Sequence, residues 1–265
     1  MRSAVITAGV LLVWVLPAAA QSIQSPWLSD AAGEPAASRA SATAPAKSES
    51  SLGSFFTALG HDFARLPSKS NLVTLGIGGA LALAVHPAEQ DLTARASRSD
   101  PLEDLFEFGS AAGGGWAQFG GALGTYALGR GIGNQQIQIL GGDLLRAQIV
   151  NSALTQGIKM AVQRTRPDQG RFSFPSGHAS ATFATATVLE RHFGWRASIP
   201  AYGVATYVAG SRLQEKRHYA SDVIFGAAIG IVAGRTVKVG RGTGQFVVSP
   251  MAVPGGAGVT FERVP

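Results

Sequence analysis

Residues 174–180 read Phe-Pro-Ser-Gly-His-Ala-Ser and stand where a polar loop gives way to a run of small, helix-compatible residues. Ser176 is a good helix-capping residue, so we expect a helix to begin at Gly177. The free N–H groups of that first turn and the positive end of the helix dipole favour an anion, and glycine lets it approach the backbone closely. The stretch therefore indicates an anion-binding helix start with His178 beside the anion, although alone it equally fits a capped helix whose histidine has no such role.

A basic cluster precedes this stretch, and it reads Lys-Met-Ala-Val-Gln-Arg-Thr-Arg-Pro over residues 159–167. Lys159 and Arg166 are seven residues apart, which is two helical turns, so on a continuous helix they share one face. Arg164 is offset from that face by well over a quarter turn, and we expect it to point elsewhere. The two cations can hold an anion at a helix end closed by Pro167, although alone they equally fit the rim of a helical bundle.

A third cluster reads Ser-Arg-Leu-Gln-Glu-Lys-Arg-His-Tyr-Ala-Ser-Asp over residues 211–222. His218 and Asp222 are four residues apart and would face the same way on a helix. The carboxylate can then accept a hydrogen bond from one imidazole nitrogen and leave the other free to attack. With Arg212 as a further cation, the clusters together supply what phosphoryl transfer needs: positive charge, a nucleophile and an acid.

In this order, the patterns Lys-x6-Arg-Pro, Pro-Ser-Gly-His and Ser-Arg-x5-His-x3-Asp resemble the signature motifs of the type 2 phosphatidic acid phosphatase family. Its superfamily also holds bacterial acid phosphatases and vanadium-dependent haloperoxidases. The resemblance covers about residues 55–240 and implies an all-α helical bundle with the site between helices. It also implies an enzyme that needs no metal or other cofactor.

The resemblance further implies a role for each motif residue. His218 would attack phosphorus and become a transient phosphohistidine, while Asp222 would orient it. His178 would protonate the leaving oxygen and then activate water for the second step. The residues implied to bind the phosphoryl oxygens are Lys159, Arg166, Ser176, Gly177 and Arg212.

Composition along the chain divides it into four parts. Residues 1–20 have a positive start, an apolar run and small residues before Gln21, which predicts a secretory signal, with an uncleaved anchor as the alternative. Residues 21–52 are rich in Ser, Ala and Pro and predict a disordered linker. The phosphatase-like domain is expected over 53–240. The tail, 241–265, holds two β-type runs that predict a short C-terminal β-hairpin.

Apolar stretches separated by polar breaks predict helices at about 53–66, 69–86, 101–128 with an interruption, 137–165, 177–194, 197–211 and 219–238. The uncharged stretches 70–85 and 108–129 are borderline in length and composition for crossing a membrane, so membrane association stays open. The chain has no cysteine, which excludes disulfides and thiol metal sites. Its net charge of +6 suits anionic partners, but the scattered basic residues do not indicate nucleic acid.

We therefore expect an exported phosphatase, periplasmic or membrane-associated. Its substrate would be a phosphomonoester or pyrophosphate of a lipid, such as phosphatidic acid, an isoprenyl pyrophosphate or lipid A. One alternative is a soluble acid phosphatase of broad specificity for small phosphomonoesters. Two others are a vanadate-dependent haloperoxidase that uses the same anion pocket, and an envelope protein that only binds anionic lipid.

Overall fold

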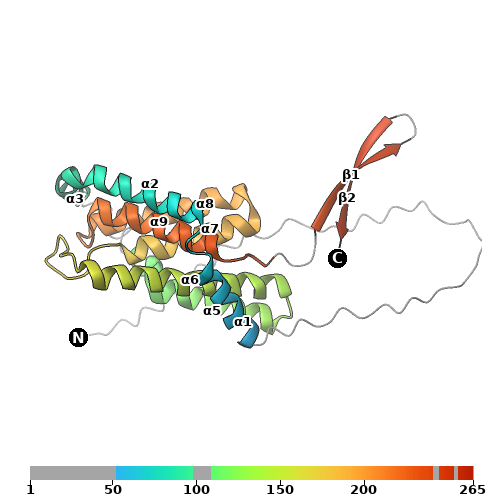
Figure 1. The fold of residues 1–265 in the computed structure, drawn as a ribbon, viewed down its shortest axis with the longest axis horizontal. Coiled ribbons are helices and arrows are strands. Elements are labelled where there is room, and N and C mark those ends of the chain that lie inside the picture. Colours follow the sequence, from blue (N-terminus) through green and yellow to red (C-terminus); the bar gives the residue numbers. More distant parts are fainter. Residues whose placement is uncertain (1–51, 98–108, 241–244, 254–255, 265) are drawn as a thin grey trace, which may run out of the picture. The chain divides into compact units, whose positions relative to one another are not determined.

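The computed structural model describes residues 52–97, 109–240, 245–253 and 256–264. The expected signal sequence, nearly all of the expected linker and the start of the expected 101–128 helix lie outside these residues. A helical turn at 109–113 precedes α5. The other elements (Figure 1) are α1 (Leu52–Ala64), α2 (Lys69–Val85), the 3-10 turn η1 (His86–Ala88), α3 (Glu89–Ala96), α5 (Gly115–Gly131), α6 (Gln135–Val162), α7 (Gly177–Phe193), α8 (Trp195–Gln214), α9 (Ala220–Thr236), β1 (Gln245–Val253) and β2 (Gly256–Val264).

The domain is all-α, as expected, and the tail forms the expected hairpin. Strands β1 and β2 pair antiparallel, with Gln245 opposite Val264 and Val253 opposite Gly256. Both strands are longer than the two β-type runs suggested. The 3-10 turn η1 and helix α3 were not expected: Pro87 interrupts the helix without ending it, and one 3-10 turn leads directly into α3.

Two expectations about helix faces are wrong. Helix α6 ends at Val162 because Gln163 adopts a left-handed conformation, with φ of 50°. Arg166 therefore lies in the following loop and does not share a helical face with Lys159. Likewise, His218 precedes α9, whose N-cap is Tyr219, so His218 and Asp222 are not successive turns of one helix.

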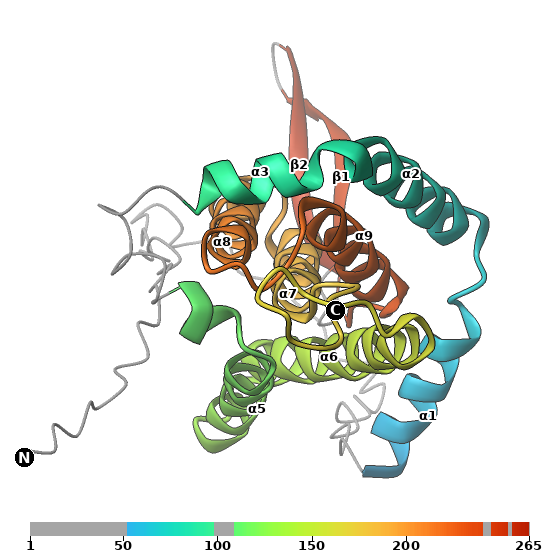
Figure 2. The ribbon, with the colours of Figure 1, turned by 90° about the vertical axis from the view of Figure 1, so that its left-hand side faces the viewer.

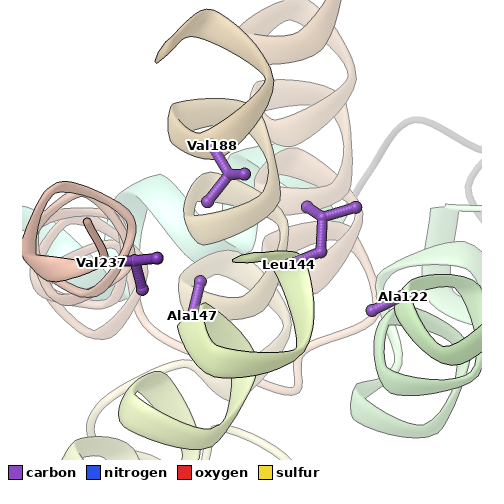
Figure 3. Packing of buried hydrophobic residues seen from close by; sticks show 5 residues of the cluster. All are labelled: Ala122, Leu144, Ala147, Val188 and Val237. Carbon is purple, nitrogen blue, oxygen red and sulfur yellow. The ribbon is translucent and has the colours of Figure 1, made fainter. Parts of the chain in front are cut away.

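Helix α7 is the centre of the bundle and packs against α6, α8 and α9 (Figure 2). As expected, Ser176 is its N-cap and Gly194 its C-cap. Much of the interior consists of alanine and valine, which allow close helix packing. One such cluster (Figure 3) joins α5, α6, α7 and the end of α9 through Ala122, Leu144, Ala147, Val188 and Val237.

A row of glycines on α9 permits its close approach to α7. Gly226, Gly230 and Gly234 recur every four residues and therefore lie on one face. A Cβ at Gly226 would lie 2.6 Å from the Ser176 carbonyl oxygen, and one at Gly230 would lie 2.2 Å from that of Ser180. Both separations are too short for a side chain, so only glycine fits. The close approach brings the start of α7 beside the start of α9, where the Ser176 N–H donates to the Asp222 carbonyl at 2.9 Å.

Far along the bundle from these helix starts, a buried ionic cluster joins α1 to α6. The Arg146 guanidinium donates to Asp62 and to Asp143, each at 2.5 Å. Asp143 also contacts His192 Nε2 at 2.9 Å, and Asp62 accepts from the Lys238 N–H at 3.1 Å. Each carboxylate is matched by donors, and the cluster fixes the chain that leaves α9.

Among the described residues, one helical segment is long and apolar enough to cross a membrane by those two criteria. It is the 28-residue run Lys69–Ala96, which comprises α2, η1 and α3. Only 17% of its most apolar stretch is buried within the protein. Its exposed large apolar side chains are Leu72, Val73, Ile77, Leu81, Leu83 and Leu92.

Candidate active site

The three sequence clusters meet around one pocket of about 250 Å³. Arg166, His178, Arg212 and His218 line it, together with Ser110, Glu215 and Arg217. The other expected site residues, which are Lys159, Ser176, Gly177 and Asp222, pack around the first set from behind. A Cβ at Gly177 would lie 3.9 Å from Lys159 Cε, so the second cluster does contact the first.

His218 lies in the turn between α8 and α9 and is 3% exposed. The backbone N–H of His218 donates to the Arg212 carbonyl at 3.2 Å, which ties the His218 backbone to the end of α8. Nδ1 lies 3.7 Å from Asp222 Oδ2 and has no hydrogen-bond partner among the described residues. At that separation the contact is electrostatic, and the hydrogen bond expected from the sequence is not formed in this conformation.

The pKa of His218 lies below its usual value, because burial disfavours the charged ring and Lys159 and Arg166 add positive charge nearby. Asp222 opposes this shift without overcoming it. The ring is therefore neutral at pH 7, and a neutral imidazole has the lone pair that a nucleophile needs.

Asp222 is fully buried and is held by several donors. Its Oδ1 accepts from Arg164 Nη1 at 2.8 Å, and its Oδ2 accepts from the Tyr219 N–H at 2.8 Å and from the Ser173 hydroxyl. Burial alone would raise the pKa of Asp222. The His218 ring, the Ser173 and Tyr219 donors and the Arg164 charge outweigh burial, so that pKa is lowered and the group is a carboxylate.

Arg164 does not line the pocket, but helical offset is not the reason, because α6 ends before it at Val162, and its role was missed. It links Asp222 to Glu89, a buried residue at the start of α3. Ser221 stands between the two acids, since it accepts from Arg164 at 2.8 Å and donates to Glu89. The Arg164 guanidinium also covers the Tyr219 ring, 4.4 Å from its centroid. Glu89 was not singled out from the sequence, where it stands two residues before Asp91 in a polar stretch that follows an apolar run.

Lys159 is buried, and its Nζ donates to the Phe172 carbonyl at 2.6 Å. Burial, with the nearby Arg166 charge, lowers the pKa of Lys159 to about 8, so the group is charged at neutral pH. The backbone of Arg166 is held in the loop, because its N–H donates to the Gly170 carbonyl at 2.8 Å. Its Nε has no partner among the described residues, so a buried donor remains for an incoming anion.

The start of α7 forms as the sequence predicted. The Ser176 hydroxyl accepts from the Ala179 N–H at 3.4 Å, a long capping bond, and the side chain is fully buried. His178 in the first turn lines the pocket. Burial, then Arg212 and the other cations, lower the pKa of His178 to about 4, so this ring is also neutral in the empty pocket.

The glycine-rich stretch before α5 lies against His178. A Cβ at Gly113 would lie 3.4 Å from His178 Cδ2, and one at Gly114 would lie 3.9 Å from Nε2. Glycines at these positions place no side chain beside the His178 ring, to which the family resemblance gives the protonation of the leaving oxygen. This neighbour was missed, because nothing in the spacing of the glycines refers to residue 178.

Arg212 is 3% exposed and is already paired within the pocket. Its Nη2 donates to Glu215 Oε1 at 2.5 Å, and Glu215 Oε2 accepts from the Ser110 hydroxyl at 3.4 Å. Arg217 lines the pocket rim, where it is half exposed, and pairs with Asp168 at 3.0 Å. Glu215 and Ser110 were not identified from the sequence, since neither belongs to a fixed motif position.

Among the described residues, no three His, Asp or Glu side chains are grouped to hold a metal ion. The donors of the pocket are cationic, and cations of this kind suit an oxyanion. What the arrangement offers chemically is a neutral, buried imidazole beside a carboxylate, facing a space lined by guanidinium groups. A second neutral imidazole stands on the same pocket.

Residues 169–243 match the family model of the PAP2 superfamily. The chain is 37% identical over 113 residues to the lipid A 1-phosphatase of Porphyromonas gingivalis, which covers 40% of this chain and 25% of that protein. It is 36% identical over 104 residues to the decaprenylphosphoryl-5-phosphoribose phosphatase of Mycobacterium tuberculosis. That match covers 35% of this chain and 57% of that protein. The matches thus span about a quarter and just over half of the lengths of these two relatives.

A solved structure resembles the fold more broadly. The transmembrane PAP2 type phosphatidylglycerolphosphate phosphatase from Bacillus subtilis aligns with a TM-score of 0.53, at 22% identity. The alignment covers 63% of this chain and 92% of that one. At this identity the likeness shows a shared helical fold.

Proposed function

We propose that the chain is a phosphatase of the PAP2 type that hydrolyses a phosphate ester or pyrophosphate of a lipid, and the match of residues 169–243 to the PAP2 superfamily model supports the proposal. One observation carries the proposal most directly. The buried, neutral His218 ring lies 3.7 Å from the Asp222 carboxylate, in a pocket that it shares with Arg166 and Arg212. A site that only bound anions would not need an oriented nucleophile.

In the first step, the neutral His218 ring attacks phosphorus and the bond from phosphorus to the leaving oxygen breaks. Arg166 and Arg212 bind the equatorial oxygens, and the buried Lys159 adds charge behind them. As the ring becomes cationic, the Asp222 carboxylate 3.7 Å from it stabilises the charge and can close to a hydrogen bond. The product of this step is a phosphohistidine.

His178 serves as the acid of the first step and the base of the second. With its pKa at about 4 in the empty pocket, it is not yet a donor at neutral pH. A bound phosphate dianion neutralises the surrounding cations and raises that pKa, so the ring gains a proton with the substrate. After it protonates the leaving oxygen, the neutral ring accepts a proton from water, which attacks phosphorus and releases phosphate from His218.

The lipid nature of the substrate rests on two supporting observations. The α2–α3 segment exposes a row of large apolar side chains, such as Leu72, Ile77 and Leu83, which suits contact with a bilayer. Both relatives are named as phosphatases of lipid-linked substrates. A 250 Å³ pocket accommodates a phosphoryl head while the acyl or prenyl chain stays outside it. The composition of residues 1–20 adds the proposal that the enzyme is exported and is periplasmic or membrane-associated.

Phosphate release by purified full-length protein in EDTA tests the function. A long-chain lipid phosphate in detergent is compared with a small aryl phosphate, and His218→Ala is compared with His61→Ala, an exposed histidine on α1. The proposal requires release that survives EDTA, favours the lipid and vanishes only in His218→Ala. Preference for the aryl ester would favour the soluble acid phosphatase. No release, with vanadate-dependent bromination instead, would favour the haloperoxidase.

A further inference from the structure

The pocket that should receive a phosphate dianion contains a carboxylate. Among the described residues that line it, Glu215 is the one acidic side chain, and it pairs with Arg212 at 2.5 Å. The bond occupies Nη2 of a guanidinium that the proposed mechanism needs for phosphoryl oxygens. An acid in this place opposes substrate binding unless it moves.

The structure allows Glu215 to leave but not Arg212. Glu215 is the C-cap residue of α8, and its side chain is 25% exposed, whereas that of Arg212 is 4% exposed. A glutamate side chain has three rotatable bonds and can swing from such a rim position into water. The contact that restrains it on its other oxygen, from the Ser110 hydroxyl, is long at 3.4 Å.

We propose that Glu215 is an internal competitor for phosphate, which occupies Arg212 in the empty pocket and is displaced when the phosphoryl group of the substrate binds. The inference rests on the proposed function and adds a determinant of affinity to it. When phosphate leaves, the carboxylate returns to Arg212. Glu215 therefore weakens the binding of substrate and of inorganic phosphate alike, and it prevents the strongly cationic pocket from retaining its product.

The opposite role for Glu215 is that of a strut, which holds Arg212 in the geometry that phosphate requires. The two roles differ in the sign of one measurable quantity. Removing a competitor tightens phosphate binding, whereas removing a strut weakens it. Because destabilised variants also bind less well, tighter binding is a result that mere structural damage does not produce.

The experiment measures the Kd of inorganic phosphate by titration calorimetry for the wild type, Glu215→Gln and Glu215→Ala. Glu190→Gln is the matched control, because it removes one negative charge on α7 where Glu190 accepts from Tyr202 outside the pocket. We expect both Glu215 variants to bind phosphate roughly tenfold more tightly, which corresponds to about 1.4 kcal/mol. The inhibition constant of phosphate during turnover falls in parallel, and the control matches the wild type.

Equilibrium binding separates this proposal from the proposed function. Unchanged or weaker phosphate binding in both Glu215 variants, with wild-type turnover intact, overturns the competitor role alone. An equal gain in Glu190→Gln also overturns it, since the effect is then one of net charge. If neither the wild type nor the Glu215 variants bind phosphate and the wild type has no turnover, the phosphatase assignment fails together with the inference.

Discussion

Arg164 Nη1 and Asp222 Oδ1 are 2.8 Å apart, on a carboxylate whose other oxygen lies 3.7 Å from His218 Nδ1. The arginine therefore holds the acid that is placed to orient the nucleophile. Through its other terminal nitrogen, Arg164 reaches Glu89 at the start of α3, which follows the apolar helix α2 after the turn η1. The exposed apolar α2–α3 segment is thus joined to the candidate nucleophile by consecutive polar contacts through Glu89, Arg164 and Asp222.

Replacing Arg164 by lysine should lower kcat about tenfold and change KM less than twofold. An ammonium is a single point of charge, so it cannot bond Asp222, Ser221 and Glu89 together as the guanidinium fork does. Lysine keeps the positive charge that helps to lower the pKa of Asp222, so the acidic limb of the kcat profile should stay near its wild-type pH in Arg164→Lys. Arg164→Gln, which removes the charge, should move that limb to higher pH. Steady-state kinetics across pH measure both effects. Arg171→Lys, an exposed arginine in the same loop, is the control; an unshifted limb in Arg164→Gln would count against the linkage.

Asp222→Asn should lower kcat by roughly 10²–10⁴-fold, as loss of an orienting carboxylate does in other histidine-dependent sites. The structure adds a cost in stability that the sequence motif did not indicate. An asparagine amide group facing Arg164 or Ser173 leaves buried donors unmatched, so the free energy of unfolding should fall by about 1–3 kcal/mol. Urea titration beside kinetics separates the two losses, and near-wild-type kcat in the folded variant would refute the orienting role.

Gly230→Ala should destabilise the fold by at least about 2 kcal/mol, because its Cβ would lie 2.2 Å from the Ser180 carbonyl oxygen. The matched control is Gly203→Ala on α8, where a Cβ would meet no atom within 4 Å. There the better helix propensity of alanine should stabilise the protein by about 0.5–1 kcal/mol. Thermal and urea unfolding of the pair measure the difference. Equal stability of the two variants would contradict the close packing of α7 on α9.

Stability should fall as pH is lowered from 7 to 5. The pKa of His178 is lowered from 6.5 to about 4 by burial and by neighbouring cations, so over that range the unfolded chain binds a proton that the folded chain does not. Stability conferred by such a group is present above its unfolded pKa and is lost as pH falls. His178 alone should account for roughly 1–2 kcal/mol of unfolding free energy, and His218 acts in the same direction.

The pH effect is measured by urea unfolding at each pH for the wild type and His178→Gln. The free energy of unfolding of His178→Gln should fall less between pH 7 and pH 5 than that of the wild type. His61→Gln, which changes an exposed histidine, should follow the wild type. Vanadate or phosphate should reduce the loss in the wild type, since a bound dianion raises the pKa of His178. A variant as pH-sensitive as the wild type would contradict the burial of a neutral ring there.

The sequence predicted the parts of the site whose chemistry is local. Ser176 caps α7, as predicted. One pocket is lined by His178, Arg212 and His218. Both predictions succeeded because each motif is a short run with its own turn or helix start. Helical periodicity failed for Lys159 and Arg166, since it continues a helix past Gln163, where the backbone turns left-handed. The two residues are nevertheless close, because the loop after α6 folds back toward the pocket.

Contacts between residues far apart in the chain were beyond the sequence. Glu89 and Arg164 are 75 positions apart, and Ser110 and Glu215 are 105 apart, so no spacing relates them. What aligns them is the packing of α3 on α8 and α9, which depends on small residues along whole helices. Nothing local in the sequence marks Glu89, which stands two residues before Asp91 in a short polar helix.

The measurement that tests the central claim most directly is trapping of the covalent intermediate. Wild-type protein is mixed with substrate labelled in the transferred phosphate, quenched in alkali within milliseconds, and digested for mass spectrometry. We predict label on His218 that is stable to alkali and lost in acid, absent in His218→Ala and retained in His61→Ala. Turnover without label on His218, or label on another residue with His218→Ala still active, would contradict the assignment of His218 as the nucleophile.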